Sequence, residues 1–213
     1  MLARYARVFD AVEINSSFYR PHRRATYERW AGSTPDGFRF AAKLPRAITH
    51  GMRLVLKGPD LDAFLDQTAG LGPKRGPILI QLPPSLAFRA EVADAFFRTM
   101  RGVCDANLAC EPRHPSWFAA EAGDLLSFHK VARVAADPAI VPQATEFGGW
   151  PGLRYVRLHG SPEIYHSNYG PDALAAIVAR IKRPAVETWC VFDNTALGAA
   201  TANALDARAA CGS

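Results

Sequence analysis

The stretch that decides the fold is Asn107-Leu-Ala-Cys-Glu-Pro-Arg-His-Pro-Ser-Trp117, a short apolar run that ends abruptly in charged and aromatic residues. Such a run is typical of a buried strand that carries a polar site at its carboxyl end. Side chains alternate along a strand, so Ala109, Glu111 and Arg113 are predicted to share one face. The plainer alternative is a strand end with a proline-rich turn, where Glu111 and Arg113 form a buried pair. Recurrence of the pattern along the chain favours the site.

Short apolar segments alternate with helical patterns from end to end. Strands are expected over residues 12–19, 38–43, 77–82, 107–111, 131–137, 154–160 and 188–194. Helices are expected over residues 2–9, 25–31, 60–69, 90–101, 118–130, 172–182 and 196–210. This alternation predicts an α/β fold, with parallel strands joined by right-handed crossovers.

Nearly every expected strand ends in polar residues. They are Glu13 and Asn15, Lys43, Gln81, Glu111 and Arg113, Asp137, Arg157 and His159, and Asp193 and Asn194. The carboxyl ends of parallel strands face one side of the fold, and that side carries the site. An open sheet would gather such residues at one switch point only, so the pattern favours a closed barrel. With about seven strands and a helix at the start, the first strand of the barrel is expected to be missing.

Composition sets broad limits on the kind of protein. The 213 residues suffice for one domain, expected over residues 1–213, with a sizeable core. The 25 Lys and Arg against 20 Asp and Glu give a net charge of +5, which permits an anionic ligand without requiring nucleic acid. No apolar run approaches the roughly 20 residues of a membrane span, and the start does not resemble a signal peptide, so a cytoplasmic protein without a membrane partner is expected. The four cysteines lack CxxC spacing and are expected to be reduced.

Several stretches together resemble one protein family. They are Phe9-Asp10, Val12-Glu-Ile-Asn-Ser-Ser-Phe-Tyr19, Phe38-Arg-Phe with Lys43 and Pro45, Ile48-Thr-His50, Gln81-Leu-Pro-Pro-Ser85, Glu111 with Arg113-His-Pro-Ser-Trp117, Tyr155-Val-Arg-Leu-His-Gly160, Asn168-Tyr169 and Phe192-Asp-Asn194. This set resembles the DUF72 (YecE-like) family of TIM barrels. The resemblance implies a TIM (β/α) barrel but no activity, because the family name denotes an unknown function. The Gly-rich first strand typical of the family, of the type Gly-Thr-x-Gly-Trp, is not found here, which bears on barrel closure and on activity.

Two glutamates and three cations carry the candidate chemistry. Glu13 and Glu111 could serve as paired carboxylates for acid/base work, as in glycoside hydrolysis, or each could be neutralised by a neighbouring cation. Lys43, Arg113 and Arg157 are suited to hold a phosphate or carboxylate, because a guanidinium forms bidentate hydrogen bonds. Internal pairing of these cations with acidic residues is the alternative.

Three histidines, His50, His114 and His159, could act as general acids or bases or as metal ligands. The neighbouring carboxylates leave a divalent metal open, but no His-x-His or His-Glu-x-x-His spacing occurs, so no metal ligand is assigned and the cofactor stays unknown. The aromatics Tyr19, Trp117, Tyr165 and Tyr169 could stack on a sugar or a base, or pack the loops over the barrel mouth. Without a Gly-x-Gly-x-x-Gly, a Walker or a Gly-x-Ser-x-Gly motif, the corresponding nucleotide sites and a serine hydrolase are disfavoured.

The sequence therefore predicts an enzyme of hydrolase, lyase or isomerase type. Its substrate is expected to be phosphorylated or otherwise anionic, either a sugar phosphate or a nucleic-acid phosphodiester. The predicted catalytic residues are Glu13, Glu111, His159 and Asp193. The predicted substrate-binding residues are Asn15, Lys43, His50, Gln81, Arg113, His114, Trp117, Arg157, Tyr169 and Asn194. Two alternatives stay open: a non-catalytic nucleic-acid-binding barrel and an inactive truncated family member. The oligomeric state is not indicated.

Overall fold

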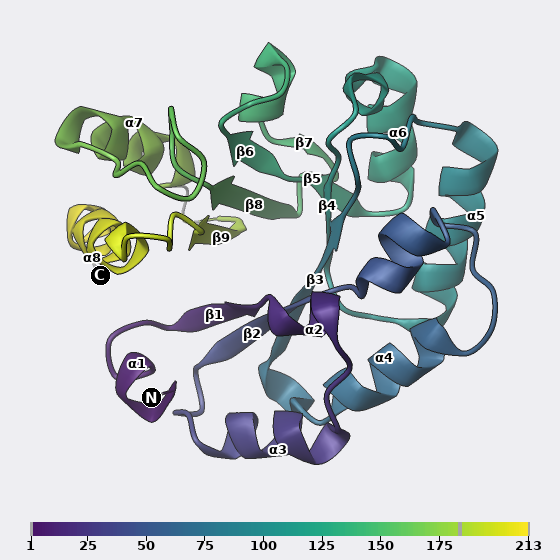
Figure 1. Ribbon diagram of the computed structural model, residues 1–213, viewed down its shortest axis with the longest axis horizontal. Coiled ribbons are helices and arrows are strands. Elements are labelled where there is room, and N and C mark those ends of the chain that lie inside the picture. The colour runs from purple at the N-terminus through teal and green to yellow at the C-terminus, as the bar shows by residue number, and fades with distance from the viewer. Residues whose placement is uncertain (1, 183–184, 213) are drawn as a thin grey trace. The chain divides into compact units, whose positions relative to one another are not determined.

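The computed structural model describes residues 2–182 and 185–212, which fall into two compact units (Figure 1). The N-terminal unit comprises residues 1–117 and the C-terminal unit residues 118–213. Helices and strands alternate in both, so the predicted α/β class is confirmed. The prediction of a single domain stays untested. Across the described ranges, no closed ring of hydrogen-bonded strands is detected.

The N-terminal unit is built on four parallel strands in the order β1-β2-β3-β4. Its elements are α1 (Leu2–Tyr5), β1 (Ala11–Ile14), α2 (Ser16–Tyr19), α3 (Arg24–Gly32), β2 (Arg39–Lys43), the π-helical turn η1 (Ala47–Gly51), α4 (Asp60–Ala69), η2 (Gly72–Lys74), β3 (Arg75–Gln81), α5 (Ala90–Val103), β4 (Leu108–Glu111) and η3 (Pro115–Phe118). Figure 1 shows α3 and α4 side by side, and the two helices contact each other.

Burial patterns explain why these segments form helices and strands. In α5 the buried residues Ala93, Phe96, Phe97 and Met100 recur at helical spacing and form one apolar stripe. Strand β3 is buried from its second residue to its last, as expected for a strand covered on both faces. These contacts fix the strand ends, which carry the polar residues predicted from the sequence.

The strand register places four of the predicted residues on one face of this sheet. Glu13 lies opposite Ala41, two residues before Lys43 on β2. Lys43 lies opposite Leu79, two residues before Gln81, and Gln81 lies opposite Glu111. Paired residues of parallel strands point to the same face, and so do residues two apart in one strand. Glu13, Lys43, Gln81 and Glu111 therefore share a face, and three of them end their strands.

The expected strand over residues 12–19 is wrong in its second half. Strand β1 ends at Ile14, and α2 begins at Ser16. The Ser17 hydroxyl lies 2.7 Å from the carbonyl oxygen of Lys43 and 3.0 Å from that of Ile14, donating toward both. A serine that bonds nearby backbone in this way competes with the strand ladder and favours a turn. Ser17 therefore does not continue the face of Glu13.

Residues 46–59, for which neither a strand nor a helix is expected from the sequence, are partly helical. Ala47–Gly51 forms the π-helical turn η1, which is closed by a 2.7 Å hydrogen bond from the Met52 amide to the Ala47 carbonyl. The turn buries Ile48 and Thr49 and holds His50 directly after the end of β2. Sequence patterning does not detect a single such turn, because it is too short to show a helical period.

The C-terminal unit contains three parallel strands in the order β6-β8-β9 and one short antiparallel pair, β5 with β7. Its elements are α6 (Ala120–Phe128), β5 (Val131–Arg133), β6 (Ala135–Asp137), η4 (Pro142–Thr145), β7 (Gly148–Gly149), β8 (Leu153–Leu158), α7 (Pro171–Ile181), β9 (Glu187–Phe192) and α8 (Ala199–Cys211). Helices α7 and α8 lie side by side (Figure 1). One face of β6-β8-β9 packs into an apolar cluster with Tyr169 and α7.

The expected single strand over residues 131–137 is wrong, because it is divided at Val134. Strand β5 pairs with β7, whereas β6 pairs with β8, so the chain changes partner between them.

No helix within the described residues combines the length and hydrophobicity that a bilayer crossing requires. None of the four cysteines forms a disulfide.

Candidate functional site

The strand ends of the N-terminal unit bring together six predicted residues, which we call the N-terminal cluster: Asn15, Lys43, His50, Gln81, Glu111 and Arg113. The Lys43 ammonium donates a 3.0 Å hydrogen bond to the Asn15 side-chain oxygen and lies 4.2 Å from the centre of the Phe18 ring. Lys43, Gln81 and Glu111 are each less than 10% exposed. Charged and amide groups buried at this depth need polar partners, so the strand ends form a connected polar region.

Glu111 and Arg113 form the ion pair that the sequence left as one alternative. Arg113 Nε and Nη2 donate to Glu111 Oε1 at 3.1 and 3.0 Å. The carboxylate side chain is 2% exposed, whereas the guanidinium side chain is 28% exposed. The pair therefore buries its acid and presents its cation to solvent. Within the described residues, Arg113 Nη1 donates to no acceptor.

The pKa of His50 is influenced by its burial and by the positive charges of this cluster. Its Nδ1 lies 2.8 Å from the Thr49 hydroxyl, and its ring meets Phe18 edge to face. Burial lowers the pKa of His50, and the charges of Arg46, Lys43 and Arg113 lower it further. The imidazole is therefore neutral at neutral pH. Arg46 is a functional candidate that the sequence reasoning missed; its position just after the Lys43 strand end and Pro45 is the signal that could have found it.

His114 and Trp117 form hydrogen bonds that hold the segment that follows β4. His114 Nδ1 lies 2.8 Å from the Ser116 hydroxyl, which accepts a 2.7 Å hydrogen bond from the Phe88 amide. The Trp117 indole is 1% exposed and donates a 2.9 Å hydrogen bond to the Leu86 carbonyl. These bonds tie the end of β4 to the segment that follows β3. Glu13 is half-buried on the face that carries Lys43.

In the C-terminal unit, Arg157, His159 and Asp193 form a second group, which we call the C-terminal cluster. Arg157 Nη2 donates to Asp193 Oδ2 at 3.0 Å, and His159 Nδ1 lies 3.1 Å from the same oxygen. The Arg157 side chain is 1% exposed and the Asp193 side chain 17%. When His159 carries its proton on Nδ1, the Asp193 carboxylate orients the imidazole ring.

Tyr169 and Asn194 belong to a buried network around Asn203. Asn203 exchanges hydrogen bonds with the backbone amide and carbonyl of Tyr169, at 3.2 and 3.0 Å, and accepts one from Asn194 at 2.9 Å. The Tyr169 hydroxyl donates a 2.6 Å bond to Asp137. Burial, followed by this bond, raises the pKa of Tyr169. The sequence reasoning did not single out Asn203, although an asparagine in an Ala-rich helix was the available signal.

The described part of the chain offers no cluster of metal-ligating side chains. Within residues 2–182 and 185–212, no group of three or more His, Cys, Asp or Glu side chains is arranged to hold an ion. Asp137 lies opposite Leu158 in the register, whereas Arg157, one residue earlier, points to the other face. Asp137 therefore does not join Asp193 and His159 on their face of the sheet.

Three comparisons place the chain among known proteins. The model of the family described as "Protein of unknown function DUF72" matches residues 1–213. The UPF0759 protein YecE of Escherichia coli K12 is 34% identical over 119 residues, which are 55% of this chain and only 43% of that protein. The same identity and coverage hold for YecE of Escherichia coli O157:H7.

Solved structures of DUF72 family proteins, which are TIM-barrel-like, share the fold. The protein of Enterococcus faecalis V583 has a TM-score of 0.85 at 21% identity, over 100% of this chain and 93% of its own. The protein of Thermotoga maritima MSB8 has a TM-score of 0.79 at 25% identity, over 96% of this chain and 85% of its own. Because the family model matches the chain over its whole length, this protein belongs to the DUF72 family.

Proposed function

We propose that this protein binds a small phosphorylated or otherwise anionic substrate at the N-terminal cluster and acts on it as an enzyme. One observation carries the proposal: burial lowers the pKa of the half-buried His50, and the nearby charges of Arg46, Lys43 and Arg113 lower it further. Three cations around one imidazole at the strand ends create a positive potential that a bound anion would neutralise.

Arg113 is the residue best placed to contact the ligand. Glu111 Oε1 accepts from Nε and Nη2, which fixes the plane of the guanidinium. The partly exposed edge that carries Nη1 then points to solvent in a fixed orientation, which lowers the entropic cost of binding a phosphate or carboxylate. The buried Glu111 is thus a positioning residue for Arg113.

Neutral His50 supports proton transfer next to the bound anion. An imidazole that is uncharged at neutral pH can accept a proton, and an adjacent anion would stabilise the protonated form. His50 is the group that we propose moves a proton at this cluster. In the C-terminal unit, Asp193 orients His159, which is a separate candidate acid or base.

The four aromatic residues suited to stack on bases divide into two buried and two exposed rings. Trp117 and Tyr169 are 1% and 5% exposed, and each donates its polar hydrogen within the protein, so these two rings offer no face for stacking. Tyr19 and Tyr165 are 77% and 42% exposed. The choice between a small anion and a nucleic acid therefore rests on the binding test.

The test is calorimetric titration with ribose 5-phosphate, inorganic phosphate and a short single-stranded DNA. We expect ribose 5-phosphate to bind, and Arg113→Met to weaken it about tenfold or more, as loss of a charge-assisted hydrogen bond implies. Arg39→Met is the matched control, because Arg39 is exposed at the opposite end of β2. Equal effects of both variants, or no binding of either phosphate, would contradict the proposal. Tighter binding of the DNA, with steep loss in salt, would instead favour the nucleic-acid alternative.

A further inference from the structure

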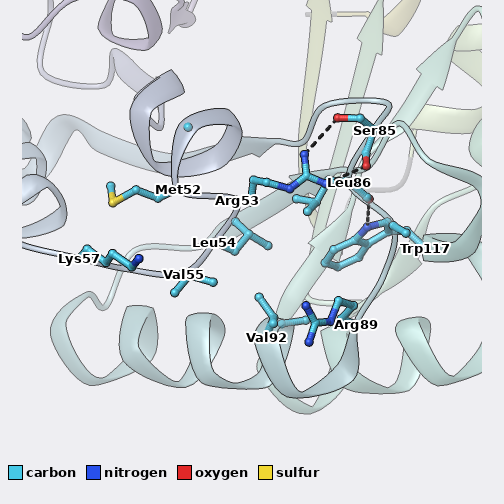
Figure 2. Close-up of a pocket in the computed structure, with 13 residues that line it drawn as sticks. Met52, Arg53, Leu54, Val55, Lys57, Ser85, Leu86, Arg89, Val92 and Trp117 are labelled. Atoms are coloured by element: carbon cyan, nitrogen blue, oxygen red, sulfur yellow. Dashed lines mark hydrogen bonds between the residues drawn. The ribbon is translucent and has the colours of Figure 1, made fainter.

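A cavity of about 470 Å³ lies in the N-terminal unit, lined by none of the six residues of the N-terminal cluster. Figure 2 shows the residues around it, which come from the segment after η1, the segment after β3, the first turn of α5, and Trp117. A volume of this size falls within the range of small-molecule sites, about 300–1,000 Å³.

The floor of this cavity is apolar. Leu54, Leu86 and Trp117 are buried beneath it, and Val55, also part of the lining, is 47% exposed. In the view of Figure 2, Leu54, Val55 and Val92 lie between Lys57 and Arg89. The half-exposed valine lies above buried apolar side chains. Binding of an apolar ligand body would remove this apolar surface from water and so lower the free energy of the complex.

The charge around the cavity has one sign. Arg53, Lys57 and Arg89 line it, and none of the 13 lining residues is acidic. Arg53 is committed to the protein, because its guanidinium donates to the Ser85 hydroxyl and carbonyl oxygens at 3.2 and 2.8 Å. The side chains of Lys57 and Arg89 make no hydrogen bond or ion pair with any described residue. Two uncompensated cations therefore face an apolar floor.

The backbone that builds this wall is held in an unusual conformation. Arg53 and Leu54 are consecutive non-glycine residues with positive φ angles of 51° and 68°. Such a pair persists only where the surroundings enforce it. Here it turns Arg53 toward Ser85 and buries Leu54, and so it shapes one side of the cavity.

From this combination we infer that the cavity is a second ligand site, for a small organic anion with a charged head on an apolar body. The carboxylate or phosphate head pairs with Lys57 and Arg89. The apolar body covers Val55, which lies above the buried Leu54 and Trp117. This site is independent of the one proposed at the strand ends.

The test uses octanoate, octyl phosphate and octanol, titrated into the full chain and followed by calorimetry. We expect both octyl anions to bind and octanol, which lacks the charge, to bind at least about tenfold more weakly. The stronger of the two anions identifies the preferred head group. Acetate, which has the head without the body, is expected not to bind measurably. Equal binding of octanol and octanoate, or binding of neither anion, would overturn the inference.

Two variants assign the binding to this cavity. Arg89→Glu reverses a charge at the residue just before α5, where an acidic side chain favours the helix, so folding is preserved. We expect it to weaken octanoate binding about tenfold or more, whereas Arg29→Glu, an exposed arginine on α3, changes it less than about twofold. Val55→Glu should abolish binding as well. Arg113→Met should leave octanoate binding unchanged, which separates this site from the strand-end site. Equal effects of Arg89→Glu and Arg29→Glu would refute the assignment.

Discussion

Each of the two polar clusters contains an ion pair between an arginine and an acidic residue, but a different member of the pair is buried in each. In the N-terminal cluster the acid is buried and the cation is exposed: Glu111 is 2% exposed and Arg113 28%. In the C-terminal cluster the cation is buried and the acid is partly exposed: Arg157 is 1% exposed and Asp193 17%. The exposed member of each pair is the one that a ligand can reach.

This difference separates binding roles from supporting ones. A buried ionised group whose partner is removed loses its compensation in a low-dielectric environment, so it contributes to stability through that partner. An exposed group is solvated in either case and can exchange water for a ligand. We therefore propose that Arg113 contacts the ligand, whereas Arg157 holds Asp193, which lies 3.1 Å from His159.

The largest predicted effect tests this assignment directly. Arg113→Met removes the guanidinium from beside the buried Glu111 carboxylate, which is 2% exposed, and we expect the free energy of unfolding to fall by about 3 kcal/mol. Arg157→Met keeps most of the side-chain volume and leaves Asp193, which is 17% exposed and can be solvated, so it is expected to cost about 1 kcal/mol. Urea denaturation measures both. If both substitutions lower the free energy of unfolding by the same amount, the difference in burial between the two clusters does not affect stability.

The second prediction concerns the network around Asn203, which is 2% exposed. Asn203→Ala leaves the backbone amide and carbonyl of Tyr169 without their side-chain partner, and we expect a loss of about 2 kcal/mol in the free energy of unfolding. Faster amide exchange around Tyr169 should accompany it. Thr201→Ala, at an exposed position of the same helix, is the control. Unchanged stability together with lost substrate binding would instead make Tyr169 and Asn194 ligand contacts, as the sequence predicts.

The smallest predicted effect is a pH dependence at His50. Its pKa in the folded protein lies below the ordinary value of 6.5, so the unfolded chain binds more protons as the pH falls through 6.5. Stability attributable to His50 is therefore constant above that pH and decreases below it, and His50→Gln should remove that decrease. Urea denaturation at pH 5 and pH 8 measures it.

A sulfate titration sharpens this test, because sulfate does not itself titrate in this range. A bound anion stabilises protonated His50, so sulfate affinity should rise as the pH falls from 7 to 5. His22, whose pKa is also lowered, by burial and then by Arg20, lies outside the N-terminal cluster and provides the control. His22→Gln should keep the pH dependence of sulfate binding, and His50→Gln should weaken it. The reverse result would remove His50 from the anion site.

Several elements were predictable because their signal is local and repeated. Strand β2 and helix α4 lie within one residue of their expected bounds, since apolar spacing, an acidic first helical turn and a following glycine mark them. The breaks at Ser16 and Val134 were not predictable. Each depends on a partner far along the chain, the Lys43 carbonyl in one case and strands β7 and β8 in the other.

The sequence by itself determined the α/β class, the family and the set of polar residues that end the strands, because side-chain period and motif spacing are properties of the chain. Only the tertiary structure decided which member of each ion pair is exposed, that Arg46 acts on His50, and that Lys57 and Arg89 share a cavity. Exposure, electrostatic proximity and cavity shape arise from segments distant in sequence meeting in space, and no local pattern encodes that meeting.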